Sequence, residues 1–259
     1  MERLKFFRKY LYNNTIIVDK FDTFPIEIKK MIKSMEGLIY AYINENKKIE
    51  TKNTENNHFG NSSFKNIYYD EVQKLCSEIY DILIEENFSI LFFHFTRLFD
   101  EEIHNLKLYG LKIYNQKEYK EKKLFVLQKH GYSREEINSI WSKALIQRDE
   151  FRENKIYFFY SLSAFDENLS FLLNWGGEIL SQSNLDKANK DSLPYIILKR
   201  IKVKNICCKE DLKGQIKAMI LNEFLQKKEL FDSSYVIESD VKIDSIIQTD
   251  NECTMFSEI

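Results

Sequence analysis

The sequence predicts an α+β protein in which a helical N-terminal region precedes a mixed α/β domain with a small, mainly antiparallel sheet. Three observations support this prediction. Apolar residues recur at helical spacing in the first third of the chain, and short runs rich in β-branched and aromatic residues begin near residue 88. Between those runs, helical patterns occur without a regular βαβ rhythm, which favours α+β over a doubly wound sheet.

The first 87 residues are expected to be mainly helical. After Pro25, apolar residues recur close to the helical period at Ile26, Ile28, Ile32, Leu38, Ile39 and Ile43. Residues 47–66 are almost wholly polar and are predicted to be a loop or linker. The helical period then resumes over residues 68–87. We therefore assign residues 1–87 to a helical region and residues 88–259 to the α+β domain.

The second region contains the predicted strands and the helices between them. The strands are expected at residues 88–95, 155–163 and 195–203, with one or two more in 234–249. The helices are expected after Thr96 or Asp100 up to Gly110, and then at 133–148, 166–176 and 210–230. Ser133 and Glu136 have the spacing of a capping box, which supports the second of these helices.

Composition excludes several classes of function. The net charge of −2 provides no global attraction to nucleic acid, although a local basic patch is still compatible with such binding. The four cysteines include no CxxC pair, so neither a zinc site nor a disulfide framework is indicated. The sequence shows neither a secretory signal nor an apolar run of the ~20 residues that a membrane-spanning helix needs. A cytoplasmic protein without a membrane segment is expected.

His94 and Arg97 form the first candidate site, at the end of the first predicted strand. Strand alternation places His94 on the face of Ile90 and Phe92, where the apolar run gives way to polar residues. A histidine there can hydrogen-bond a ribose or an amide, and an arginine can clamp a phosphate. The alternative is a core histidine satisfied by backbone groups, with Arg97 in a surface ion pair.

The second candidate site is the segment Trp175, Gly176, Gly177 and Glu178. Two adjacent glycines permit a positive φ and a close backbone approach to a ligand. The carboxylate directly after them is held by the backbone, and it can orient a ribose hydroxyl or accept a proton. The alternative is the C-terminal cap of a helix, with Trp175 in the core and Glu178 in water.

Weaker candidates lie on the later strands. Tyr157, Tyr160 and Ser161 can line the same pocket, although strand tyrosines are also common packing residues. Glu238 lies on the last predicted strand, within residues 234–249, where a lone carboxylate is usually a solvated edge residue.

The order of these segments resembles the ADP-ribosyltransferase family. The stretch HFTRL (residues 94–98) is similar to the H-x-T type motif of the first strand in that fold. The stretch KIYFFYSLS (residues 155–163) resembles a later strand in which an aromatic residue precedes a serine. The resemblance covers roughly residues 88–249. Separately, the pattern HxTRL…GL…WGGE is similar to a pattern in uncharacterised bacterial proteins, to which no activity is attached.

The resemblance implies NAD as the substrate. His94 would bind the nicotinamide ribose, Thr96 and Arg97 would contact the cofactor, and Tyr157 or Tyr160 would pack on the nicotinamide ring. Glu238 or Glu178 would be the catalytic carboxylate, because the family position near the start of a late strand is Ser234 in this chain. The reaction would be transfer of ADP-ribose or hydrolysis of NAD, as in a bacterial toxin or a phage-defence effector.

Two other readings are open. The same pocket can belong to a non-catalytic module that binds a nucleotide or a nucleic-acid end, with basic stretches such as residues 199–204 contacting phosphates. The N-terminal helices can also contact a partner protein or a second copy of the chain. The acceptor of a transferred group, whether protein or nucleic acid, is left open.

Overall fold

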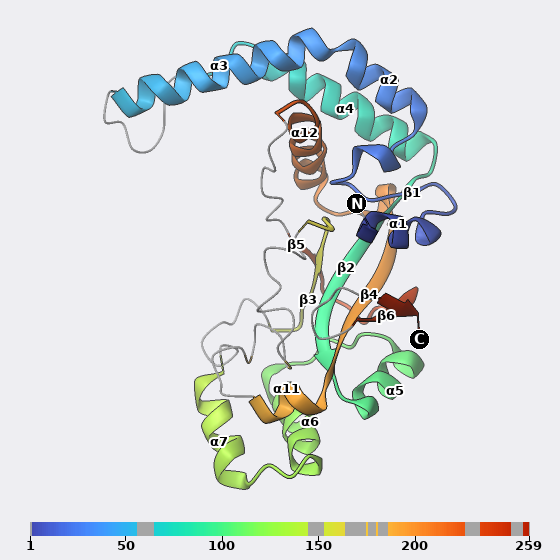
Figure 1. Cartoon of the computed structure of the whole chain (residues 1–259), viewed down its shortest axis with the longest axis vertical. Helices are drawn as coiled ribbons and strands as arrows, with labels where there is room; N and C mark the ends of the chain where they lie inside the picture. Colours follow the sequence, from blue (N-terminus) through green and yellow to red (C-terminus); the bar gives the residue numbers. More distant parts are fainter. Residues whose placement is uncertain are drawn as a thin grey trace. The chain divides into compact units, whose positions relative to one another are not determined.

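The computed structural model describes residues 2–55, 65–144, 153–163, 175, 180, 186–225, 234–249 and 256–258. They form two compact units, shown with their labelled elements in Figure 1. The first unit is Met1–Leu91 with Ile201–Phe231, and the second is Phe92–Arg200 with Asp232–Ile259. The first unit thus extends a few residues past the expected boundary at 87, and it also takes in a helix from the C-terminal part of the chain.

The first unit is mainly helical. Its elements are α1 (Glu2–Phe7), η1 (Arg8–Tyr10), β1 (Thr15–Ile16), η2 (Phe21–Thr23), α2 (Ile26–Ser34), α3 (Glu36–Glu55), α4 (Tyr69–Glu85), η5 (Val203–Asn205) and α12 (Lys209–Leu225). Helix α12 packs on α4 and α3, which explains why it joins this unit. The buried side chains of α4 and α12 include Leu75, Ile79, Ile216 and Ile220. Burial of these apolar faces is the main favourable term for the three helices.

Helix α3 is longer than the sequence predicted. It continues through Glu55, into the segment that was expected to be a loop from residue 47. Local polar interactions support the extra turns: Lys48 Nζ lies 3.2 Å from Glu45 Oε2, and Thr51 Oγ1 donates to the carbonyl of Lys47 at 2.9 Å. Glu and Lys have good helix propensity, so a polar segment can stay helical without an apolar face.

The second unit contains most of the sheet and the helices around it. Its elements are β2 (Ser89–Leu98, which begins in the first unit), α5 (Asp100–Tyr109), α6 (Gln116–Lys129), α7 (Arg134–Lys143), β3 (Ile156–Phe159), α11 (Asp186–Asp191), β4 (Leu193–Lys202, which ends in the first unit), β5 (Ser234–Ile237), β6 (Ser245–Thr249) and β7 (Phe256–Glu258). The strand order is β5-β3-β2-β4-β6-β7, and within the first unit β1 pairs in parallel with the start of β2. The pairs β2–β3, β3–β5, β4–β6 and β6–β7 are antiparallel.

The predicted α+β class with a mainly antiparallel sheet is confirmed. The predicted strands at 88–95, 155–163 and 195–203 correspond to β2, β3 and β4. The capping box is also present, because Ser133 Oγ accepts from Glu136 N while the Glu136 carboxylate accepts from Ser133 N. Helix α6 was not predicted, because its N-terminal half is almost entirely polar. Its signal was Asn115, whose side chain accepts from Glu118 N and caps the helix.

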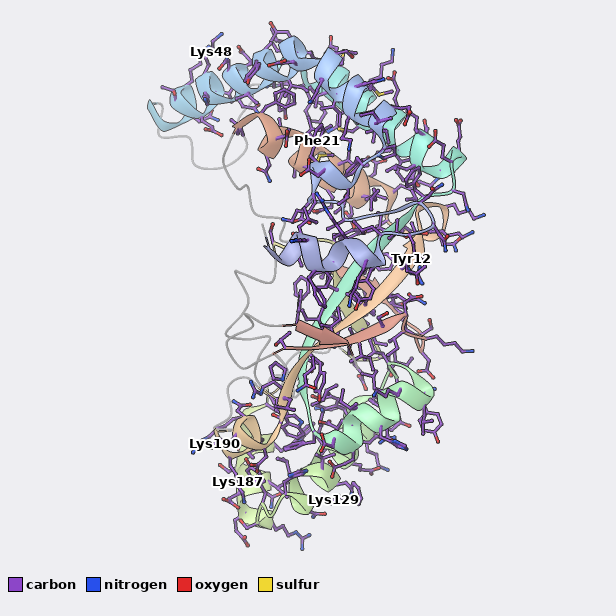
Figure 2. The ribbon with its side chains drawn as sticks, turned by 45° about the vertical axis from the view of Figure 1, so that its right-hand side comes forward. Tyr12, Phe21, Lys48, Lys129, Lys187 and Lys190 are labelled. Atoms are coloured by element: carbon purple, nitrogen blue, oxygen red, sulfur yellow. The ribbon has the colours of Figure 1, made fainter. Side chains whose placement is uncertain are left out.

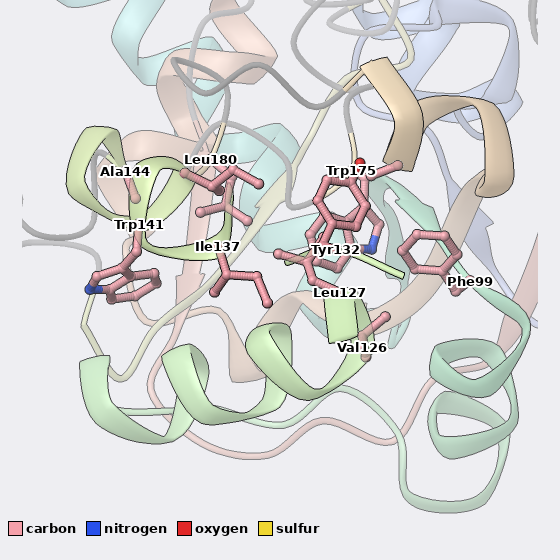
Figure 3. Packing of buried hydrophobic residues seen from close by; sticks show 11 residues of the cluster. Phe99, Val126, Leu127, Tyr132, Ile137, Trp141, Ala144, Trp175 and Leu180 are labelled. Atoms are coloured by element: carbon pink, nitrogen blue, oxygen red, sulfur yellow. The ribbon is translucent and has the colours of Figure 1, made fainter. Parts of the chain in front are cut away.

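Two apolar clusters hold the helices of the second unit. Ile103 and Leu106 of α5 pack with Tyr195 and Ile197 of β4 and with Ile246 of β6. The other cluster joins α6, α7 and α11 around Trp175 (Figure 3). Its members are Phe99, Val126, Leu127, Tyr132, Ile137, Ile140, Trp141, Ala144, Trp175, Leu180 and Ala188. Lys129, Lys187 and Lys190 lie exposed on the outer side of α6 and α11 (Figure 2).

Two features are absent from the part of the chain that the structure describes. In that part of the chain, no helix combines the length and the apolar character needed to cross a bilayer. Among the same residues, no group of three or more His, Cys, Asp and Glu side chains is arranged to hold a metal ion.

Candidate functional site

The register of β2 decides which predicted residues share a face. Phe93 of β2 pairs with Phe159 of β3, and side chains alternate along each strand. Ring contacts confirm the alternation. The ring centroids of Phe92 and Tyr160 are 4.8 Å apart on one face, and those of Phe95 and Phe159 are 5.7 Å apart on the other. His94 therefore shares the face of Phe92 and Tyr160.

Arg97 and Tyr157 belong to the opposite face of the sheet from His94. The strand continues to Leu98, so Arg97 is inside it, and three residues along a strand reverse the side-chain direction. Tyr157 is two residues from Phe159 and shares its face. The expected convergence of the His94 and Arg97 side chains on one ligand is therefore not supported, because the strand was predicted to end before Arg97.

His94 is held by the backbone of β3. Its Nδ1 lies 2.8 Å from the carbonyl oxygen of Tyr157, and its ring lies 5.7 Å from that of Phe158. Because a carbonyl only accepts, Nδ1 carries the proton and Nε2 is an acceptor in the neutral ring. In the described part of the chain, Nε2 has no hydrogen-bond partner, and the side chain is partly exposed.

The surroundings keep this ring neutral. Burial lowers the pKa of His94, the hydrogen bond to Tyr157 raises it, and the positive charge of Lys123 lowers it further. The net effect is a pKa below the ordinary value of 6.5. A neutral imidazole with a fixed tautomer can accept a proton or a hydroxyl hydrogen bond at neutral pH.

The lowered pKa of His94 predicts a loss of stability on mild acidification. Below about pH 6.5 the unfolded chain binds a proton at this position before the folded chain does. We expect the free energy of unfolding to fall from pH 6.5 down through the lowered pKa of the folded state. Urea denaturation between pH 7.5 and 5.5 measures this slope. H94Q should reduce it, and H104Q, at an exposed position on α5, should not. Equal slopes in all three proteins would contradict the prediction.

Arg97 is a buried residue whose guanidinium binds backbone carbonyl groups at the C-terminal end of α11. It is 6% exposed, and its Nη2 donates to the carbonyl oxygens of Asn189 at 2.7 Å and Ser192 at 2.8 Å. Its Nε donates to Ser192 Oγ at 3.3 Å, and that hydroxyl in turn donates to the carbonyl of Ala188 at 2.6 Å. Because Arg97 is buried, the alternative in which it forms a surface ion pair does not apply. Arg97 satisfies the carbonyl end of α11, where a cation also interacts favourably with the helix dipole.

R97K is expected to destabilise the second unit by about 2 kcal/mol, because a single ammonium cannot reproduce the planar fork that reaches Asn189 and Ser192. Urea denaturation of the variant measures this cost. The control is R200K. Arg200 Nη2 lies 3.1 Å from Asp244 Oδ1 near the surface, so its replacement should lower the free energy of unfolding by less than about 1 kcal/mol. A loss for R97K no larger than that for R200K would count against the assigned role.

Trp175 lies beside Arg97, so the two motifs singled out in the sequence do meet. The two residues form a parallel β-bridge. The Trp175 backbone N donates to Asn189 Oδ1 at 2.9 Å, and its indole Nε1 donates to Glu102 Oε2 at 2.6 Å. The prediction of a helix through this residue is wrong at Trp175, whose backbone is paired with a strand. Trp175 is 0% exposed, which agrees with the alternative that placed its side chain in the core.

Sequence reasoning missed a charged pair next to Trp175. Glu102 Oε1 accepts from Lys123 Nζ at 2.5 Å, and Glu102 Oε2 also accepts from Phe99 N at 3.1 Å. The ammonium lies 4.6 Å from the Trp175 ring centroid. Glu102 was noticed only as a residue favouring a first helical turn, and Lys123 lies in the helix that was not predicted. The two come from α5 and α6, so only packing brings them together.

The other predicted residues are placed as follows. Thr96 and Ser161 are buried, and their hydroxyl groups make local hydrogen bonds. Thr96 Oγ1 donates to the Arg97 carbonyl oxygen at 3.4 Å, and Ser161 Oγ accepts from Ser163 N at 2.9 Å. Tyr160 is buried against Phe92 and Tyr235. Glu238 follows β5, and its side chain is 72% exposed. Its Oε1 lies 3.9 Å from Lys155 Nζ. Gly176, Gly177 and Glu178 lie outside the described residues.

The described residues thus form an α+β structure whose sheet carries a partly exposed histidine, and no described residue hydrogen-bonds its Nε2. Comparison of the chain with models of protein families, with curated proteins and with solved structures found no match. The function must therefore be inferred from the site itself.

Proposed function

We propose that the protein is a cytoplasmic NAD-dependent enzyme of the ADP-ribosyltransferase type, which transfers ADP-ribose or hydrolyses NAD. The observation that carries the proposal is His94, fixed by the Tyr157 carbonyl with Nε2 available as an acceptor. A ribose hydroxyl is a suitable donor to that nitrogen. The aromatic rings of Phe92, Tyr160 and Tyr235 on the same side of the sheet supply apolar surroundings.

The proposed reaction breaks the bond between nicotinamide and the ribose C1′. The bonding electrons leave with nicotinamide, and an oxygen of water or of an acceptor bonds to C1′ and releases a proton. Positive charge develops on the ribose in an oxocarbenium-like transition state, and a carboxylate stabilises it. Glu178 and Glu238 are the candidates for that carboxylate in this proposal. His94 holds the ribose and does not itself attack it.

Release of nicotinamide from NAD by the purified protein tests this proposal. We expect turnover in the wild type, with a loss of about 100-fold or more in H94A and in either E178A or E238A. H104A, at an exposed histidine of α5, is the matched control and should retain activity. The proposal fails if NAD is not consumed with water or with any protein or nucleic-acid acceptor, or if H94A is fully active.

A second candidate function is a non-catalytic nucleotide-binding module. The exposure of Glu238 favours it, because a carboxylate that is 72% exposed lacks the enclosed surroundings in which charge stabilisation is strong. Such a module would show ligand-induced thermal stabilisation by NAD or ADP-ribose without any product, since binding to the folded state alone raises its stability. Stabilisation that H94A abolishes, with no nicotinamide released, would favour the module over the enzyme.

A further inference from the structure

The segment before β1 concentrates positive charge in the first unit. Residues 3–18 contain four cations, Arg3, Lys5, Arg8 and Lys9, and no acidic residue, in a chain whose net charge is −2. Lys5, Arg8 and Lys9 have the i, i+3 and i+4 spacing along α1 and η1, so they are neighbours on one side of the segment. All three are exposed. Together with Tyr12, we call them the N-terminal basic patch.

The opposite side of the same segment is packed inside the first unit. Phe7 is 0% exposed and Tyr10 is 6% exposed, and their ring centroids are 6.3 Å apart. Burial of these two rings sets the orientation of the segment, because an amphipathic segment turns its apolar side to the core. The three cations of the patch are therefore held on the surface.

Hydrogen bonds fix the backbone that carries Tyr12. Thr15 Oγ1 donates to the Tyr12 carbonyl at 2.6 Å, and Asn14 Nδ2 donates to the Glu86 carbonyl at 3.0 Å. Ser89 N donates to the Asn14 carbonyl at 2.8 Å. Tyr12 itself is 48% exposed, so an ordered backbone presents a half-exposed ring. Because Glu86 adds an exposed acidic residue next to Asn14, the patch does not extend past Asn14.

The charge of the patch is not balanced by ion pairs. In the described part of the chain, no carboxylate forms an ion pair with Lys5 or Arg8. The basic stretch that the sequence suggested for phosphate contacts differs in this respect, because Lys199 and Arg200 lie 3.6 and 3.1 Å from the carboxylate of Asp244. A ligand at the N-terminal basic patch therefore does not have to displace an acidic side chain from Lys5 or Arg8.

Three cations followed by an exposed ring complement a single-stranded nucleic acid. A guanidinium can donate two parallel hydrogen bonds to a phosphate, and lysine ammonium groups add charge. A half-exposed tyrosine ring provides a surface on which a base can stack. Binding in the plane of an anionic membrane instead needs an apolar face that enters the lipid. In this segment, Phe7 and Tyr10 are already buried in the protein.

We propose that the N-terminal basic patch binds single-stranded nucleic acid, with Lys5, Arg8 and Lys9 contacting phosphates and Tyr12 stacking on a base. Phosphate contacts and base stacking carry little sequence information, so binding is expected to depend only weakly on base sequence. The inference goes beyond the proposed function and does not rest on it, because the patch belongs to the first unit and His94 to the second.

Fluorescence anisotropy with labelled oligonucleotides tests the patch. The probes are single strands of about 12 thymidine or uridine nucleotides and a DNA duplex of the same length. They are titrated with the wild type, K5Q/R8Q/K9Q, Y12A and the control K47Q/K48Q/K52Q. The control removes the same charge from exposed lysines of α3 in the same unit, where Lys48 pairs with Glu45 at 3.2 Å. Tyr12 and Lys48 are labelled in Figure 2.

We expect the wild type to bind both single strands. Three phosphate contacts predict that its affinity falls about 20-fold between about 50 and 200 mM KCl. K5Q/R8Q/K9Q should bind at least 10-fold more weakly at the lower salt concentration and lose most of this salt dependence. Y12A should weaken binding at least 5-fold without changing the salt dependence. K47Q/K48Q/K52Q should bind within about 2-fold of the wild type.

Four results overturn the proposal. The first is a wild type that binds neither single strand, and the second is equal weakening by the two triple variants, which would make net charge the cause. The third is tighter binding of the duplex than of the single strands. The fourth is patch-dependent binding to phosphatidylcholine vesicles with about 30% phosphatidylserine in the absence of nucleic-acid binding, which would assign the surface to a membrane.

Two further measurements keep the test decisive. Thermal unfolding followed by circular dichroism checks that K5Q/R8Q/K9Q folds. If it does not, a single strand containing 4-thiouridine is photo-crosslinked to the wild type, and crosslinks that all lie outside residues 5–12 overturn the proposal. Nicotinamide release, measured without nucleic acid, should be the same in K5Q/R8Q/K9Q and in the wild type. Failure of the enzyme proposal and failure of this inference are therefore separate results.

Discussion

E102Q is expected to destabilise the second unit by about 3 kcal/mol, because it removes one partner of an enclosed ion pair and leaves Lys123 uncompensated. The carboxylate is 14% exposed and accepts three hydrogen bonds, from Lys123, Phe99 N and Trp175 Nε1. A glutamine has one oxygen in place of two, so it cannot accept all three bonds. The amide also cannot balance the ammonium, which makes the loss larger than that of one neutral hydrogen bond.

Urea denaturation followed by tryptophan fluorescence measures this loss. Trp141 and Trp175 are the two tryptophans of the chain, and both lie in the second unit. The control is E101Q. Glu101 is 29% exposed and pairs with Lys129 at 3.3 Å, so its replacement should cost less than about 1 kcal/mol. E102Q/K123M should recover most of the stability, since no unpaired charge is left. A double variant as unstable as E102Q would show that the charge pair is not the cause.

G110A is expected to be at least as damaging, with a loss of about 3 kcal/mol or more. Gly110 has φ +75° and ψ −171°, a region that is almost restricted to glycine. A methyl group on it would lie 2.3 Å from the carbonyl oxygen of Val241. That oxygen accepts from Leu111 N at 2.9 Å, and Val241 N donates to the Leu111 carbonyl at 2.8 Å. The alanine must therefore break this bridge or move one of its two backbone segments.

G131A is the matched control for G110A. Gly131 has the same φ of +75°, but its nearest neighbour to an added methyl group is the flexible end of Lys187 at 3.4 Å. Only the backbone strain applies there, at about 1–2 kcal/mol. The difference between the two variants in urea denaturation measures the clash with Val241. If both variants lose the same free energy of unfolding, the close approach of Val241 is not important for stability.

Much of the secondary structure followed from local signals. Gly110 was predicted to end a helix, and α5 does end at Tyr109, because a glycine with positive φ follows it. Ser133 and Glu136 predicted the start of α7 for an equally local reason. The polar segment after residue 47 was misjudged, since charged residues without an apolar stripe look the same in a loop and in an exposed helix.

The candidate site was only partly predictable. His94 was found because a histidine at the end of an apolar strand is a local pattern. The partner that fixes its tautomer, the Tyr157 carbonyl, depends on the register of β2 and β3, which no single segment specifies. Lys123 gave no signal of its own, because a lysine among lysines in a polar helix looks like a solvated residue.

Local sequence patterns were sufficient to predict the α+β class, most of the strands, the end of α5 before Gly110, the start of α7 after Ser133, and His94 as a candidate site residue. Each of these depends on interactions within a few residues of the chain, which pattern and propensity describe. Packing between distant segments accounts for the hydrogen bond of Arg97 to Asn189 in α11, the pairing of Trp175 with β2, and the ion pair of Glu102 and Lys123. Those contacts join residues that are distant in the sequence, and their charges become important only because packing removes them from water.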